Sequence, residues 1–141
     1  MSETFKISRG AFEEVCAHAR AARPAECCGL LGGVAPRART IYRLTNVAAD
    51  PLVAYEAAPR ELFEAQRRMR GRGEELLAIY HSHPRSSDPS PSERDVRLAY
   101  YPQAVHLIVG FAAGGGPVVR AFRLYEAERR WEGVEYEICE E

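Results

Sequence analysis

The sequence predicts a single mixed α/β domain in which a β-sheet is flanked by helices. A length of 141 residues fits one domain that buries about two-thirds of the surface its unfolded chain exposes. Segments with strand-like alternation or consecutive apolar residues are interspersed with stretches of helical spacing. No internal repeat or long linker interrupts the chain, so we expect one domain over residues 1–141.

The N-terminal part predicts a strand, a helix and two further strands. Residues 4–8, TFKIS, alternate like a short strand, and helical spacing then extends over residues 9–22, before Pro24. The segments CCGLLGGV (27–34) and RTIYRLTNV (39–47) are typical of neighbouring strands.

The middle and C-terminal parts continue this alternation. LVAYEA (52–57) is typical of another strand, and a second helix is expected over residues 60–70, before the breaker GRG. ELLAIY (75–80) is apolar on consecutive residues, which indicates a central strand covered on both faces. The expected remainder is a helix reaching residues 97–101 and strands at AVHLIVGF (104–111), VVRAFRLYE (118–126) and GVEYEIC (133–139).

Composition and charge exclude several classes of protein. The formal net charge is −1, from 19 basic and 20 acidic residues, so neither nucleic acid nor a membrane surface is an expected partner. The longest apolar run, LIVGFAA, is far shorter than the roughly 18 residues of a membrane-spanning helix, and the N-terminus lacks a signal-peptide pattern. We therefore expect a cytoplasmic protein. The cysteines at positions 16, 27, 28 and 139 include no CxxC pair and are expected to be free thiols.

The stretch YHSHPRSSDPSPSERDV (80–96) carries the clearest chemical signal. Alternate residues of a strand point to one face about 6.6 Å apart, so His81 and His83 can converge on one ion while Ser82 faces away. A catalytic zinc site usually takes three protein ligands, so a third ligand is required. Asp95 is the preferred third ligand, and Asp88, which no regular element holds in place, is a competing one.

Helix-start signals place Asp95 close to the histidines. Ser90 can cap a helix, Pro91 suits its first position and Glu93 can complete a capping box, while Ser92 and Asp95 share one helical face. An alternative remains open: Ser92 and Asp95 can themselves form a capping box. Each histidine can also be a structural residue without a metal.

Two motifs resemble those of the JAMM (MPN-plus) metalloprotease family. HSHP followed by PSERD resembles the H-x-H-P…P-S-x-x-D motif, and PAECCGLLGG (24–33) resembles the segment that bears the catalytic glutamate of that family. The resemblance implies an MPN fold, similar to cytidine deaminase. It also implies one zinc per chain bound by His81, His83 and Asp95. Glu26 is then the general acid/base, and Ser92 helps to stabilise the oxyanion. One departure is that eleven residues separate His83 from Asp95, where the family usually has ten.

The function that this resemblance implies is zinc-dependent hydrolysis of an amide bond. The expected substrate is the C-terminus of a ubiquitin-like or sulfur-carrier protein with a Gly-Gly tail, and a homodimer is left open. Two alternatives are a RadC-like member, because HPRSSDPSPS also resembles the HPSGDPTPS loop of that branch, and a non-catalytic binding scaffold.

Four other residues attract simpler interpretations. His106 is expected in the core or close to the site, and His18 in solvent. Trp131 is expected to pack against a strand or a protein interface, and Asn46 to form a turn, with substrate binding as its alternative role.

Overall fold

The structure is a computed structural model that describes residues 4–97, 99 and 101–140. In chain order the elements are β1 (Phe5–Ser8), α1 (Arg9–Ala22), β2 (Cys28–Val34), β3 (Arg37–Leu44), α2 (Pro59–Gly71), β4 (Glu75–Ser82), α3 (Glu93–Arg97), β5 (Val105–Phe111), β6 (Pro117–Tyr125), β7 (Arg130–Val134) and β8 (Tyr136–Cys139). The predicted α/β class is confirmed, and the strands form one mixed sheet in the order β7-β6-β5-β4-β2-β3-β1-β8.

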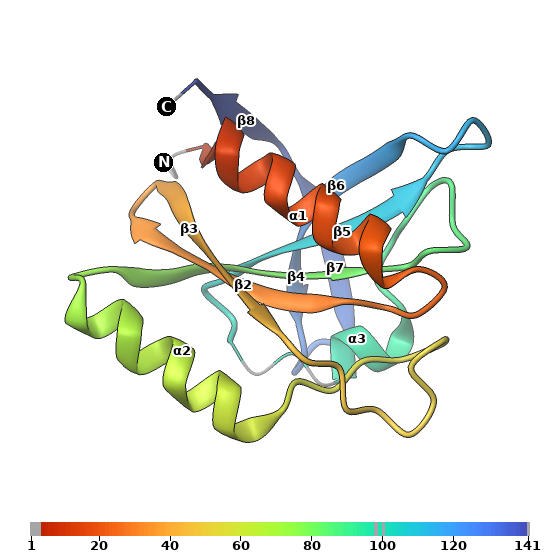
Figure 1. Ribbon diagram of the computed structural model, residues 1–141, viewed down its shortest axis with the longest axis horizontal. Coiled ribbons are helices and arrows are strands. Elements are labelled where there is room, and N and C mark those ends of the chain that lie inside the picture. The colour runs from red at the N-terminus through yellow and green to blue at the C-terminus, as the bar shows by residue number, and fades with distance from the viewer. Residues whose placement is uncertain (1–3, 98, 100, 141) are drawn as a thin grey trace.

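The sheet is curled, with α1 on one face and α2 on the other (Figure 1). Two separate apolar clusters reflect this arrangement: Val15 of α1 packs with Leu31 and Tyr80, whereas Met69 of α2 packs with Leu30 and Ile79. Successive residues of β2 and β4 thus belong to opposite clusters. A strand covered on both faces has to be apolar on consecutive residues, as the sequence of β4 predicted.

The C-terminal segment differs from its prediction. Residues 133–139 were expected to form one strand, but they contribute to β7 and β8, which pair with β6 and β1 respectively. Only Glu135 separates these two strands, although they lie at opposite ends of the strand order. The twist and curl of the sheet bring its two edges together, so a single residue carries the chain between them.

Two other predictions are wrong in part. Residues 52–57 form no strand in the structure, where only an isolated bridge joins Asn46 to Ala57. The helix expected to reach residues 97–101 spans Glu93–Arg97, and its expected continuation falls partly on positions 98 and 100, outside the described residues.

The predicted helix over residues 9–22 is confirmed as α1, with the Ser8 hydroxyl accepting a hydrogen bond from the N–H of Ala11.

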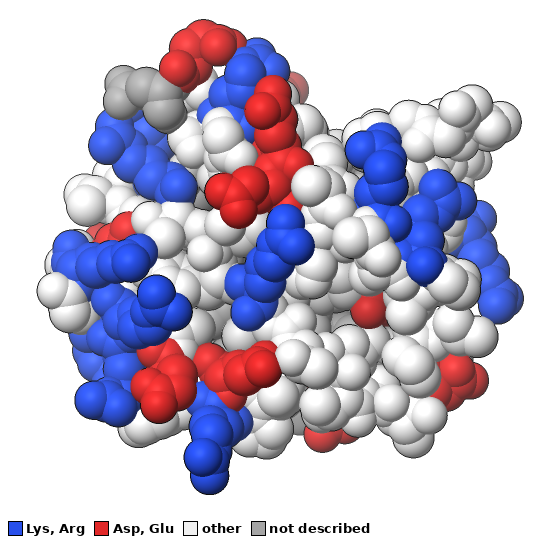
Figure 2. Space-filling view, in the orientation of Figure 1, with Lys and Arg blue, Asp and Glu red and all other residues white. Residues whose placement is uncertain are grey.

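Charged side chains of both signs are scattered over the face shown in Figure 2, much of which is uncharged, and basic side chains gather over α2 at the lower left. This helix carries Arg60, Arg67, Arg68 and Arg70 together with Glu61 and Glu64. No described helix is both long and apolar enough to span a membrane.

His18 is half-buried, so its predicted exposure to solvent is wrong. Its Nδ1 lies 2.7 Å from the hydroxyl of Tyr80, and the two rings meet edge to face. Gly29 makes room for this contact, because a Cβ at that position would overlap the Tyr80 ring. The contact connects α1 with the central strand β4.

Acidification should weaken the fold through His18. Burial, assisted by the charge of Arg43, lowers the pKa of His18 from 6.5 to about 4. Between these values the unfolded chain binds a proton that the folded chain does not, so stability falls as pH falls from about 6.5 to about 4. The melting temperature of His18→Gln should therefore decline less over this range than that of the wild type. Parallel declines in differential scanning calorimetry would contradict the assignment.

Candidate metal centre

The two motif histidines lie at the C-terminal end of β4, as predicted. His81 is the last residue but one of that strand and pairs with Cys28 of β2 and Ile108 of β5. His83 follows the strand, and its N–H donates to the carbonyl of Val109 over 2.8 Å. The two Nε2 atoms are 3.1 Å apart. Because strands lie on both sides of β4, the backbone that carries these rings is held firmly.

The side chain of Ser82 points away from the two histidines, as the alternation of side chains along a strand predicts. Its buried hydroxyl accepts a hydrogen bond of 2.9 Å from the N–H of Cys27. Its own N–H donates to the carbonyl of Cys27. These two hydrogen bonds hold Cys27, which follows Glu26, against Ser82, which lies between the histidines.

Asp95 reaches the histidines from α3 and also caps that helix. Helix α3 begins at Glu93, so the predicted capping by Ser90 with Glu93 is wrong, and Ser92 takes that position. The N–H of Asp95 donates to Ser92 Oγ over 3.0 Å, and the N–H of Ser92 donates to Asp95 Oδ2 over 2.8 Å. The alternative interpretation, a Ser92–Asp95 capping box, is therefore correct. It does not exclude the predicted position beside the histidines, because the same Oδ2 atom serves both.

The nitrogen and oxygen atoms of these three side chains fit a zinc ion. Asp95 Oδ2 lies 3.2 Å from the Nε2 of His81 and 3.2 Å from that of His83, which completes an almost equilateral triangle with the 3.1 Å His81–His83 edge. Tetrahedral zinc with bonds of about 2.0–2.1 Å requires ligand atoms about 3.3–3.4 Å apart. The triangle is thus close to the size needed.

Protonation in this cluster is governed by the same three groups. Burial disfavours a charged His83, but the hydrogen bond and the negative charge of Asp95 outweigh burial and raise the pKa of His83. Burial acts to raise the pKa of the Asp95 carboxyl as well. The charge and hydrogen bond of His81, joined by the bond from His83, reverse this effect and lower the Asp95 pKa far below its usual range.

Glu26 is a second buried carboxylate at the centre. It directly precedes Cys27 and Cys28 at the start of β2, and its oxygen lies within 4.8 Å of a ring nitrogen of each histidine. Burial raises its pKa, while the neighbouring histidines oppose the rise. A buried carboxyl group with a raised pKa beside the triangle suits proton transfer.

Asn46 organises the loop that lies over Glu26. Its amide nitrogen donates to the carbonyls of Glu26 and Ala54, and its amide oxygen accepts from the N–H groups of Ala48 and Glu56, each over 3.0 Å. These four bonds use both donors and both lone pairs of the side-chain amide. The turn-forming role predicted for Asn46 is confirmed, and the turn is tied to the backbone of Glu26.

The same loop supplies two further contacts to the centre. The carbonyl of Pro51 accepts a hydrogen bond of 2.8 Å from the N–H of Glu26. The ring of Tyr55 stacks on the imidazole of His81 with 4.4 Å between centroids. Tyr55 was not predicted as a site residue, because nothing in LVAYEA indicates a ring placed against a histidine 26 positions later.

The competing ligand Asp88 is not part of the centre. Its side chain is 81% exposed and accepts a hydrogen bond of 2.6 Å from Arg120 on β6. The loop around it packs on β5, since the carbonyl of Ser86 accepts from the N–H of Phe111. The longer loop between His83 and Asp95 is thus accommodated at the surface, away from the triangle.

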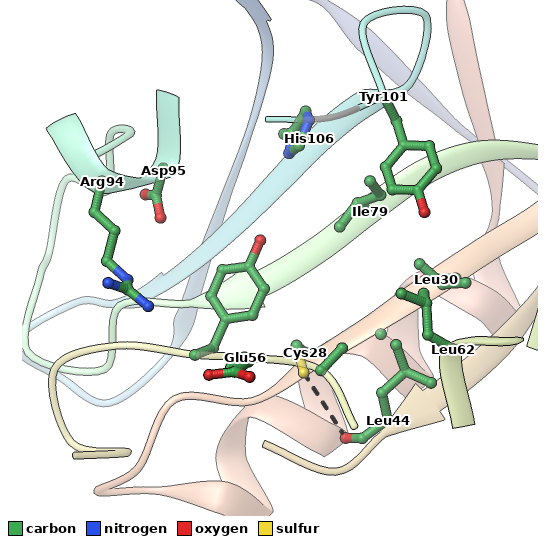
Figure 3. Close-up of a pocket in the computed structure, with 13 residues that line it drawn as sticks. Cys28, Leu30, Leu44, Glu56, Leu62, Ile79, Arg94, Asp95, Tyr101 and His106 are labelled. Atoms are coloured by element: carbon green, nitrogen blue, oxygen red, sulfur yellow. Dashed lines mark hydrogen bonds between the residues drawn. The ribbon is translucent and has the colours of Figure 1, made fainter. Parts of the chain in front are cut away.

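The remaining predicted side chains are placed as follows. Ser92 is exposed at the start of α3, its Oγ acts as an acceptor in the capping box, and its hydroxyl hydrogen has no partner among the described residues. His106 is buried in β5, as expected. Trp131 packs edge to face on Phe122 of β6. Arg94, which the sequence did not indicate, lines a cavity beside Asp95 (Figure 3).

Comparisons with known proteins agree on the class. Residues 8–125 match the family described as prokaryotic homologues of the JAB domain. The chain is 38% identical over 114 residues to the desampylase of Haloferax volcanii, covering 76% of this chain and 81% of that protein. It is also 38% identical over 122 residues to the probable TtuB-protein conjugate cleaving protease of Thermus thermophilus, covering 86% and 77%.

A more distant relative and a solved structure extend the agreement. The CysO-cysteine peptidase of Mycobacterium tuberculosis is 31% identical over 112 residues, covering 78% of this chain and 75% of the relative. The solution structure of protein DSY2949 from Desulfitobacterium hafniense superimposes with a TM-score of 0.81 at 32% identity, covering 98% of this chain and 94% of that one.

A curled mixed sheet with a His-His-Asp triangle at the end of its central strand defines a peptidase of the JAMM type. The chain belongs to the family of prokaryotic homologues of the JAB domain. The resemblance to the JAMM family, the MPN fold and the peptidase class expected from the sequence are confirmed.

Removing the side-chain amide of Asn46 should loosen the loop over Glu26. Asn46→Ala leaves two carbonyls and two N–H groups without their partner, and we expect a loss of about 1–3 kcal/mol in unfolding free energy. Limited proteolysis should cut residues 47–57 faster, and denaturant titration should report the loss. Asp50→Ala, which removes one exposed hydrogen bond to the N–H of Leu52, is the matched control in the same loop. Equal stability and equal cleavage of both variants would contradict this role.

Proposed function

We propose that this protein hydrolyses the amide bond between the C-terminal glycine of a ubiquitin-like or sulfur-carrier protein and an amine. The triangle of His81, His83 and Asp95 beside the buried carboxyl of Glu26 is the observation that carries the chemistry. The names of the relatives support the substrate: two refer to cleavage of a conjugate or of a protein linked to cysteine, and all three are 31–38% identical to this chain.

In this proposal His81, His83 and Asp95 hold one zinc ion. When bound, zinc polarises the amide carbonyl and makes water a stronger nucleophile. Ring orientation is maintained by β4 and by the Tyr55 ring stacked on His81, and the N–H of Ser92 orients Oδ2 of Asp95. Outer contacts of this kind tune a metal site.

Glu26 and Ser92 are proposed to act on the substrate. Glu26 takes a proton from the attacking water and delivers it to the departing amine, a task for which its raised pKa is suited. The hydroxyl of Ser92 donates its free hydrogen to the oxygen that becomes negative as the amide carbonyl is attacked. Neither Glu26 nor Ser92 is one of the three proposed zinc ligands, so both side chains remain available to the substrate.

A Gly-Gly tail suits this centre because glycine residues allow a chain to approach a buried site closely. We place the activity in the cytoplasm. The four cysteines are free thiols, which is typical of a reducing compartment.

Two isosteric substitutions should separate metal binding from proton transfer. Asp95→Asn and Glu26→Gln each replace a carboxylate near the histidines by an amide. Asp95→Asn should lower zinc affinity at least tenfold, because the negative charge of a ligand is lost. His83→Ala, which removes a ligand altogether, should also lower it at least tenfold. Glu26→Gln should keep one zinc per chain while hydrolysis falls by about 10²-fold or more. Zinc content is measured by mass spectrometry of metals and turnover by intact-mass analysis.

The reverse result would identify Glu26 as the third ligand: zinc lost in Glu26→Gln and retained in Asp95→Asn. Full zinc retention in both His81→Ala and His83→Ala would refute the metal centre altogether.

The substrate is tested with a full-length carrier adduct and its isolated C-terminal peptide. Because the folded carrier contributes binding surface beyond its tail, kcat/KM should be at least tenfold higher for the full-length adduct. Equal cleavage of the two would indicate a general peptidase. Cleavage of neither by zinc-loaded protein would refute the proposed function.

A further inference from the structure

An apolar cavity of about 350 Å³ lies beside the proposed metal centre. Its walls include Leu30 of β2, Ile79 of β4 and Leu62 of α2, and Asp95 and Arg94 of α3 border it (Figure 3). The cavity therefore extends from the proposed centre into the layer between the sheet and α2. None of the roles proposed above for His81, His83, Glu26 or Ser92 uses this space.

His106 supplies an unpaired polar group to the cavity. Only 4% of this residue is exposed, and neither Nδ1 nor Nε2 has a hydrogen-bond partner among the described residues. Burial, with the charge of His81, lowers its pKa to about 4, so the ring is neutral at pH 7 and offers one donor and one acceptor. A buried polar group without a partner calls for an explanation, and a ligand or an ordered water inside the cavity supplies one.

Arg94 offers a positive charge at the border of the cavity. Within the described part of the chain its guanidinium has no hydrogen bond or ion pair. Its field nevertheless reaches the centre: burial raises the pKa of the Tyr55 hydroxyl, and the charge of Arg94 acts against that rise. A guanidinium without a protein partner beside Asp95 is placed to meet a carboxylate brought by a ligand.

The size of the cavity limits its occupant. A volume of 350 Å³ corresponds to roughly a dozen water molecules at about 30 Å³ each, near the lower end for ligand pockets. One amino-acid residue fits such a space, and a helix or a folded domain does not. The apolar part of the lining, with Arg94 as the cation at its border beside the carboxylates of Glu56 and Asp95, matches an amino acid with a medium-sized apolar side chain.

We propose that this cavity is a leaving-group pocket, which receives the amino acid released from the carrier with its side chain against the apolar walls and its carboxylate on Arg94. The inference rests on the proposed function. Hydrolysis breaks the amide C–N bond: water gives its hydroxyl to the carrier carbonyl, and its proton goes to the amine of the departing amino acid. The pocket binds this second product and thereby selects among adducts.

Carrier adducts of glycine, leucine and leucinamide test the selection. Wild-type protein should cleave the leucine adduct with kcat/KM at least about tenfold above that of the glycine adduct, since even one added methylene group in an apolar pocket contributes about tenfold. Arg94→Gln should lower the leucine-to-leucinamide ratio about tenfold. Arg97→Gln, an exposed change of the same kind on α3, should leave that ratio unchanged.

Two separate substitutions that reduce the volume of the pocket test its role, so that one variant remains if the other fails to fold. Leu62→Trp and Ala57→Leu both add volume to its lining and should bring the leucine-to-glycine ratio close to one. Phe63→Leu, at a position on α2 that is 59% exposed, is the control. Equal cleavage of the glycine and leucine adducts by the wild type, or an unchanged ratio in the folded filling variants, would overturn the proposal.

Direct binding separates failure of the pocket from failure of the proposed function. In zinc-free protein, free L-leucine should shift the ring resonances of His106 in NMR spectra, and glycine should not. If no adduct is cleaved but leucine shifts His106, the pocket stands and the assigned reaction is wrong. If adducts are cleaved but leucine produces no shift and no preference, the reaction stands and the pocket is refuted.

Discussion

The pairing of β4 with β2 is the constraint on which the centre depends. It places Cys28 opposite His81, so the chain segment that carries Glu26 ends beside the segment that carries the histidines. The Ser82–Cys27 hydrogen bonds extend this pairing past the regular strands, to the residues adjoining Glu26 and His83. A slip of one residue would turn His81 to the α1 face, because strand side chains alternate. The register therefore decides whether the carboxyl and imidazole groups meet at all.

Asp95 shows how one oxygen atom can satisfy two structural demands. A short helix of five residues has little stability of its own, and its reciprocal cap with Ser92 holds the first turn. The same cap fixes the carboxylate in front of the histidines, so the cost of ordering that side chain is already met by helix formation. Capping and proposed metal binding are therefore cooperative in this chain, and the two sequence interpretations of Ser92 and Asp95 were not true alternatives.

The sequence predicted those features of the fold and the site that depend on residues close together in the chain, and it missed those that depend on distant contacts. Local sequence patterns predicted helix α1, the paired strands β2 and β3, and the covered strand β4. The relative positions of His81 and His83 follow from the extended backbone at the end of β4. Glu26 was selected by resemblance, because its position depends on cross-strand pairing that composition does not encode. Tyr55 and Arg94 were missed, since stacking on His81 and lining the cavity depend on a loop conformation and on packing between distant segments. The division between β7 and β8 likewise depends on the curl of the whole sheet.

The electrostatics of the cluster bear on how it would hold the proposed metal ion. The hydrogen bond and negative charge of Asp95 raise the pKa of His83, so this pair favours a proton more than an isolated imidazole would. His81, His83 and Asp95 would hold the proposed zinc ion as neutral imidazoles and an ionised carboxylate, so metal binding would compete with that proton and would weaken as the solution becomes more acidic. Glu26 lies outside the triangle, and burial favours its protonated form. The fold thus keeps one carboxylate ionised through its hydrogen bonds with the histidines and Ser92, and it places a second buried carboxyl group beside it whose pKa is raised.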